Sequence, residues 1–229
     1  MVSLQEIVSK KTIVVFDFDG VLVDSVHVKA DAFFQMYQKY GSALANEVRR
    51  HHLANGGMSR FAKFKYYQET LLGEKVNPEV ITALSIQFSG LVVEKIISSS
   101  WMPGAELFLN FLYKKSKLCM VNSATPQEEI ELIIQKRQMG KYFSGVFGSP
   151  APKADNLQKI IDKFSINPSQ IIFFGDAMAD WNAACEMGVS FVGVGEHIRR
   201  LAISKRECDY FTNDFKLIHK LSLERNKNV

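Results

Sequence analysis

The feature that most constrains this fold is a short apolar run that ends abruptly in two carboxylates. Thr12-Ile-Val-Val-Phe16 is a β-branched run of the kind that forms a strand buried on both faces. Asp17 and Asp19 follow at once, and carboxylates there must be paired, hydrated or bound to a metal because burying a free charge is costly. In open α/β sheets, ligands bind at this end of the strands. The pattern therefore indicates a ligand site, with an acidic Asp-Gly turn as the alternative.

Similar apolar runs recur along the chain and alternate with stretches of helical periodicity. This alternation is typical of a parallel sheet covered by helices, so we predict an α/β fold. Thr125-Pro-Gln-Glu128 fits a capping box that starts a helix, and Gly140 fits its end. The further strands are predicted at 118–121, around 145–147, at 171–174 and at 190–194.

Residues 25–100 interrupt the alternation. Apolar side chains such as Phe33 and Tyr37 recur there at helical spacing, and no convincing strand separates them. We predict an all-helical subdomain over 25–100, inserted directly after the first strand. Residues 1–24 and 101–229 would then form the α/β core.

Polar side chains also follow the other predicted strands. The hydroxyl of Ser123 and the following amide, that of Ala124, could hold an anion, and Lys153 opens a helix. Asp176 and Asp180 follow the next strand. Taken singly, these residues fit turns, helix caps and a solvated lysine. Together with the two earlier carboxylates they would repel one another unless a hard cation lies among them, and oxygen ligands suit Mg²⁺.

The order of these groups resembles the motifs of a known superfamily. Asp-x-Asp-Gly-Val-x-x-Asp-Ser, then Ser, Lys and Gly-Asp-x-x-x-Asp, resemble the four motifs of the haloacid dehalogenase (HAD) superfamily, from residue 13 to about residue 195. The helical insert is similar to the C1 cap of the phosphoglycolate phosphatase and β-phosphoglucomutase branch. The resemblance implies a Rossmann-like core, a covalent aspartyl-phosphate and Mg²⁺ as cofactor.

The resemblance also implies a role for each acidic residue. Asp17 matches the nucleophile, whose second oxygen binds the metal. Asp19 matches the general acid/base, and its backbone carbonyl is a further metal ligand. Asp176 matches a metal ligand, and Asp180 binds the metal directly or through water.

Two other residues match groups that bind the phosphoryl group. Ser123 would hydrogen-bond it, and Lys153 would neutralise both the nucleophile and the phosphate. A shift of the alignment by one residue would place Asn122 at the serine position. We favour Ser123, because Ser-Ala-Thr-Pro fits the usual serine followed by a capped helix.

In the insert, Asn55-Gly-Gly-Met-Ser-Arg60 is a glycine-containing turn that leads into a helix. It resembles a Gly-x-Ser-Arg stretch that reaches into the site in the β-phosphoglucomutase branch. By that resemblance Arg60 contacts a substrate phosphate, with Asn55, Ser59 and Lys63 nearby. The alternative is that Ser59 is a plain N-cap and Arg60 a solvated residue of the first turn.

The acid at position 19 favours phosphate esters, because the dehalogenase and phosphonate-cleaving branches lack it. We therefore expect a Mg²⁺-dependent phosphatase acting on a small phosphorylated metabolite, a sugar phosphate or a phosphoglycolate-like acid. A phosphomutase using Asp17 and Asp19 is the alternative within enzymes. A non-catalytic phosphate-binding protein is the alternative outside them.

Charge and hydropathy exclude other classes. The net charge of +4 is scattered, without a basic stripe interleaved with aromatics, so we expect no nucleic-acid partner. The sequence contains no run of ~18 uncharged apolar residues, so we predict no membrane span. The first residues lack the apolar run that is typical of a signal peptide. We expect a cytoplasmic protein that is a monomer or a homodimer.

Overall fold

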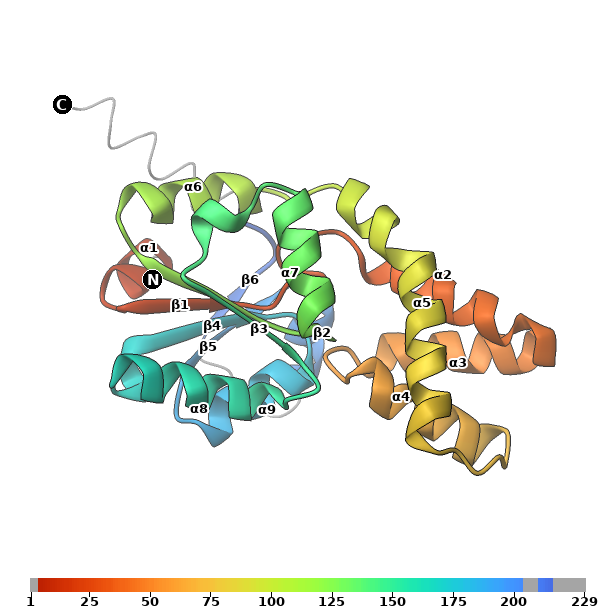
Figure 1. Ribbon diagram of the computed structural model, residues 1–229. Coiled ribbons are helices and arrows are strands. Elements are labelled where there is room, and N and C mark those ends of the chain that lie inside the picture. Colours follow the sequence, from red (N-terminus) through yellow and green to blue (C-terminus); the bar gives the residue numbers. More distant parts are fainter. Residues whose placement is uncertain (1–3, 204–209, 216–229) are drawn as a thin grey trace.

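The computed structural model describes residues 4–203 and 210–215 (Figure 1). The predicted α/β class is confirmed, since the described strands form one parallel sheet in the order β3-β2-β1-β4-β5-β6. This is the order of a doubly wound, Rossmann-like sheet. The strands are β1 Ile13–Phe16, β2 Leu118–Pro126, β3 Gly145–Ser149, β4 Ile171–Gly175, β5 Ser190–Val194 and β6 Tyr210–Thr212.

Helices cover both faces of the sheet and extend beyond one of its ends. In Figure 1, α6 and α7 lie above the sheet, α8 and α9 below it, and α2 to α5 to its right. The described α-helices are α1 Leu4–Ser9, α2 Val26–Tyr37, α3 Ser42–Ala54, α4 Arg60–Tyr66, α5 Pro78–Ser98, α6 Ala105–Lys114, α7 Gln127–Lys136, α8 Lys153–Phe164, α9 Met178–Glu186 and α10 Glu196–Ile203.

The central strand β1 is buried on both faces. Val14 and Phe16 belong to the apolar cluster that includes α6 and α7, whereas Ile13 and Val15 belong to the cluster that includes α8 and α9. All four side chains are fully buried. This explains why the strand reads as a continuous apolar run rather than an alternating one. It also places the residues after β1 at the point where the strand order reverses between β1 and β4.

The chain from α2 to α5, which we call the helical segment, contains no described strand and packs around its own aromatic centre. The ring of Phe33 lies 4.3 Å from that of Phe88 and 5.3 Å from that of Phe64, centroid to centroid. The two stretches of chain that connect the helical segment to the sheet are joined by backbone hydrogen bonds. Asp24 N donates to Ser100 O at 3.0 Å, and the N–H of Met102 donates to the carbonyl of Leu22 at 2.9 Å.

Three details differ from the sequence prediction. The capping box at Thr125 is wrong: β2 continues to Pro126, α7 begins at Gln127, and no side chain caps it. The proposed end at Gly140 is also wrong, because α7 ends at Lys136 and Gly140 opens a 3₁₀ turn. The edge strand β6 was not foreseen, since its three residues carry too little pattern.

The helix α5 is long and apolar enough to cross a membrane by length and composition alone. Its apolar residues do not form an uncharged run, because Glu94 and Lys95 lie within the helix. In this fold α5 packs against α2, α4 and α7, with Phe88, Val92 and Ile96 buried. Only one stripe of α5 is buried by this packing, and Val80 and Ile86 are exposed.

Replacing Phe108 by alanine should lower the free energy of unfolding by about 3–5 kcal/mol, because the side chain is buried and a cavity would remain. Its ring meets those of Phe16, Phe174 and Phe215. Leu107→Ala, at a half-exposed position on the same helix, should change it by no more than about 0.5 kcal/mol. Urea unfolding measures both, and equal losses would contradict the assignment of the core.

Candidate active site

Asp17 follows β1 and is buried against a lysine from α8. Lys153 Nζ lies 2.8 Å from Asp17 Oδ2, and the N–H of Phe18 donates to Asp17 Oδ1 at 2.6 Å. Burial raises the pKa of Asp17 to about 7; Lys153 opposes that rise, while Asp180 and Asp19 add to it. Without further positive charge, this carboxylate is therefore only partly ionised at neutral pH.

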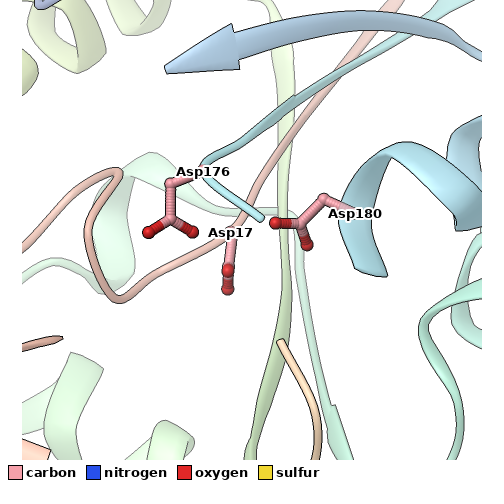
Figure 2. A group of neighbouring side chains, drawn as sticks. All are labelled: Asp17, Asp176 and Asp180. Carbon is pink, nitrogen blue, oxygen red and sulfur yellow. The ribbon is translucent and has the colours of Figure 1, made fainter. Parts of the chain in front are cut away.

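Three carboxylates converge at this edge of the sheet (Figure 2). Asp17, Asp176 and Asp180 each offer an oxygen, and these oxygens lie within 4.8 Å of one another. Burial, followed by the charges of Asp17 and Asp180, raises the pKa of Asp176 well above its ordinary value. A hard divalent cation fits this set, because it would bind oxygen ligands and relieve the repulsion that Lys153 alone does not remove.

Lys153 is the cation common to two of these acids. It forms ion pairs with Asp17 and Asp180, and the second oxygen of Asp180 accepts from Ala177 N at the start of α9. Burial lowers the pKa of Lys153, but the two carboxylates outweigh that effect and raise it. The lysine therefore stays charged. The dipole of α8 disfavours a positive charge at the N-terminus of the helix, and the two carboxylates offset this effect.

Asp19 lies apart from the carboxylate cluster and has its own partners. Its carboxylate forms an ion pair with Lys29, accepts from Ser25 Oγ at 2.6 Å, and accepts from Thr125 Oγ1 at 3.2 Å. Burial raises the pKa of Asp19, but the charge and hydrogen bond of Lys29, with those of the two hydroxyls, lower it overall. Asp19 is thus ionised when no ligand is bound.

Gly20 makes this turn possible. Its φ of +76° is a left-handed conformation that other residues rarely adopt, and a Cβ there would lie 2.3 Å from Asp176 Oδ2. The turn after β1 therefore runs directly against the loop after β4. This close approach is the physical reason for glycine in Asp-x-Asp-Gly.

The two candidates at the end of β2 have different surroundings. Asn122 is fully buried; its amide donates to Lys153 O at 2.9 Å, and its oxygen accepts from Asn156. Ser123 is also buried, and its oxygen accepts from Thr125 N at 3.1 Å, which leaves the hydroxyl proton to donate elsewhere. Asn122 thus holds the loop that carries Lys153.

Arg60 joins the helical segment to the core. Its guanidinium forms a two-pronged ion pair with Glu129 of α7 and donates to Ser89 Oγ at 2.7 Å. Arg60 is 5% exposed, so the alternative of a solvated residue is wrong. Contact with a substrate phosphate stays a prediction, because in this structure Glu129 occupies both terminal nitrogens.

The other predicted residues of this loop have local partners. Asn55 ends α3 and donates to His51 O at 2.9 Å, whereas Ser59 caps α4 by accepting from Ala62 N. Between them, a Cβ at Gly57 would lie only 2.8 Å from that of Ala179, so the loop closes directly on the first turn of α9. The helical segment and the core are therefore in contact beside the carboxylates.

A cavity of about 490 Å³ lies between the helical segment and the sheet. Its walls include Asp17, Asp19 and Asp176 from the core, and Arg60 and Lys63 from the helical segment; Ala124 also lines it. The predicted residues that the cavity brings together thus come from both parts of the chain. Ser123 and Lys153 lie next to Ala124 and Asp17, respectively.

Three residues that pair with Asp19 or Arg60 were not predicted from the sequence. Lys29, Thr125 and Glu129 hold Asp19 and Arg60, but none was assigned to the site. A signal for Lys29 existed, since a lysine in the first turn of a helix opposes the dipole and so needs a reason to be there. Thr125 was hidden because it fits an ordinary capping box, and Glu129 because its partner Arg60 lies 69 residues away in the sequence.

Comparisons with known proteins agree with this geometry. The sequence matches the family described as haloacid dehalogenase-like hydrolase over residues 14–194. It is 26% identical to the phosphoglycolate phosphatase of Pasteurella multocida over 89% of this chain and 94% of that protein. It is 23% identical to the phosphorylated carbohydrates phosphatase of Thermotoga maritima, over 77% and 81% respectively. The fold is similar to that of β-phosphoglucomutase from Clostridium difficile (TM-score 0.70, 16% identity, 95% and 98% of the two chains).

The raised pKa values predict how the metal-free protein responds to pH. The folded pKa of Asp17 is about 7 and its unfolded value about 4, so ionisation between these values destabilises the folded state. Asp176 acts in the same direction. His52, whose pKa is lowered, acts in the opposite direction. As the pH rises from about 4 to about 7 in EDTA, the melting temperature of the parent protein should therefore fall relative to that of Asp17→Asn, which keeps His52.

At pH 7, Mg²⁺ at a hundredfold excess over its Kd should raise the melting temperature by roughly 5–10 °C. Asp176→Asn should remove most of this rise and stabilise the metal-free protein. Asp162→Asn, at an exposed position of α8, is the control. Thermal scans with and without EDTA measure this, and an undiminished Mg²⁺ effect in Asp176→Asn would contradict the site.

Proposed function

This chain belongs to the haloacid dehalogenase-like hydrolase family, and on that premise we propose that it is a Mg²⁺-dependent phosphatase of small phosphorylated metabolites. The observation that carries this proposal is the meeting of Asp17, Asp176 and Asp180, with Lys153 paired to Asp17 and Asp180, beside a cavity that Asp17 and Asp176 line. A nucleophile, a counter-charge and a cation site thus lie within reach of one phosphoryl group.

In the first step, a carboxylate oxygen of Asp17 attacks phosphorus, and the bond from phosphorus to the ester oxygen breaks. Asp19 gives its proton to the departing alkoxide. Lys153 reduces the repulsion between the carboxylate and the phosphate, which is the main barrier for a weak nucleophile. Asp17, Asp176, Asp180 and the carbonyl of Asp19 would hold Mg²⁺, which would supply further positive charge.

In the second step, Asp19 takes a proton from water as that water attacks phosphorus, which frees Asp17 and releases phosphate. The ionised state of Asp19 in the empty site suits this role as a base. Entry of a phosphate ester brings negative charge next to Asp19, which favours its protonated form for the first step. One residue thus serves both proton transfers.

The remaining groups would bind and enclose the substrate. Ser123 and the amide of Ala124 would donate to the transferred phosphoryl group, and the helical segment would act as a cap that excludes water while the phosphoenzyme forms. The names of the relatives point to phosphoglycolate and phosphorylated carbohydrates as substrate classes. We propose a sugar phosphate or a phosphorylated acid as the substrate.

Asp17→Asn should lower kcat/KM for phosphate release by at least ~10³-fold, because an amide cannot form the phosphoenzyme. Asp162→Asn should remain within about twofold of the parent protein. Released phosphate and remaining ester would both be quantified over a panel of sugar phosphates, phosphorylated acids and nucleotides, with Mg²⁺ or EDTA. Rearranged ester without phosphate would point to the phosphomutase instead, and full activity of Asp17→Asn would refute the mechanism.

A further inference from the structure

Lys63 on α4 is a buried cation that the mechanism above does not use. It is 2% exposed and lies in the wall of the cavity. Its Nζ lies 2.9 Å from His52 Nδ1 and 3.4 Å from His52 O, so the imidazole and a carbonyl accept two of its protons. Within residues 4–203 and 210–215, it forms no ion pair with a carboxylate.

The other cations around the cavity contrast with Lys63 in this respect. Lys29 is paired with Asp19, Arg60 with Glu129, and Arg50 with Glu47. A buried ammonium without an anion costs several kcal/mol, because neutral acceptors replace only part of its hydration. The folded protein thus carries a cost at Lys63 that an anionic ligand in the cavity would offset.

The charges of the catalytic groups reach Lys63 and affect its pKa. Burial lowers the pKa of Lys63 to about 7 and the charge of Lys29 adds to this, while the charges of Asp19 and Asp176 oppose it. Burial, followed by the charge of Lys63, lowers the pKa of His52 well below its ordinary value. His52 is therefore neutral, and its Nδ1 accepts from Lys63, while a hydrogen bond to the backbone of Val26 opposes the fall in its pKa.

The cavity is larger than a two-carbon acid needs. Its volume of about 490 Å³ falls in the ~300–1,000 Å³ range of pockets that bury ligands of drug size. Phe33, Leu53, Met58 and Phe88 form apolar parts of its wall. These surfaces suit the carbon skeleton of a sugar-sized molecule between charged groups at its two ends.

We propose that Lys63, which His52 positions, binds a second anionic group of the substrate, a carboxylate or a second phosphate, away from the phosphoryl group that is transferred. The substrate is accordingly a phosphorylated compound of sugar size that carries two anionic groups. This inference rests on the proposed function for the position of the transferred phosphoryl group. According to this inference, Lys63 determines which phosphate esters the protein prefers.

The test uses pairs of esters that differ only at the remote end. Gluconate 6-phosphate is compared with glucitol 6-phosphate, and glucose 1,6-bisphosphate with glucose 6-phosphate. The parent protein should prefer the member with the second anion. In Lys63→Met, the ratio of kcat/KM within the preferred pair should fall by ~30-fold or more, as for loss of one partner of a buried charge pair.

Two further variants separate binding from folding. Lys65→Met, at an exposed position of the same helix, should leave the ratio unchanged. Lys63→Arg keeps the charge and should restore most of the preference. Which pair responds distinguishes a carboxylate from a second phosphate. If Lys63→Met lowers kcat/KM equally for both members of a pair, Lys63 acts on the transferred phosphoryl group. If kcat/KM changes for neither member, Lys63 has no role in binding the ester. Either result overturns the proposal.

Calorimetry with Asp17→Asn, which binds without turnover, separates this inference from the proposed function. A preference for the second anion that is lost in Asp17→Asn/Lys63→Met supports the anion site even if the parent protein releases no phosphate from any ester. In that case the proposed function fails alone. Binding of neither member of either pair would count against both.

Discussion

The pairing of Lys153 with Asp17 and Asp180 is the interaction on which the site depends. Asp17 and Asp180 are buried and Asp176 is partly buried, and their oxygens lie within 4.8 Å of one another, so the ionised carboxylates repel. Lys153 offsets part of this repulsion through its ion pairs with Asp17 and Asp180. The polar core around it keeps it in place, since Asn122 binds the carbonyl of Lys153 and is in turn held by Asn156. One lysine is not enough for three acids, which is why the raised pKa values of Asp17 and Asp176 mark a place for a metal ion.

A second set of charges decides how the helical segment meets the sheet. Arg60 and Glu129 are both buried where the two parts touch, and such a pair requires close contact to offset its lost hydration. Gly56 and Gly57 let the loop before α4 approach Ala177 and Ala179, where any Cβ would collide or be strained. These contacts bring walls from both parts of the chain to one cavity.

Much of the fold and of the core site could be predicted, for a physical reason. Strands buried on both faces read as short apolar runs, and parallel strands bring their carboxyl ends to one edge, so the residues after β1, β2 and β4 had to meet. The errors lie where one residue type serves two purposes. Thr125 has the appearance of a helix cap, yet its hydroxyl binds Asp19, because β2 runs five residues further than its apolar part indicates.

The amino-acid sequence by itself determined the order of the first five strands and of the helices between them, the helical insertion, and the acids, serine and lysine of the core, because these follow from periodicity and from positions at strand ends. Only the tertiary structure decided which charges are paired. Lys29 finds Asp19, Arg60 finds Glu129, and Lys63 finds no acid among the described residues. Pairing across 69 residues, as between Arg60 and Glu129, leaves no local pattern, since it depends on how two separately folded parts pack. Which charges are paired around the cavity is therefore set by contacts that no single segment encodes.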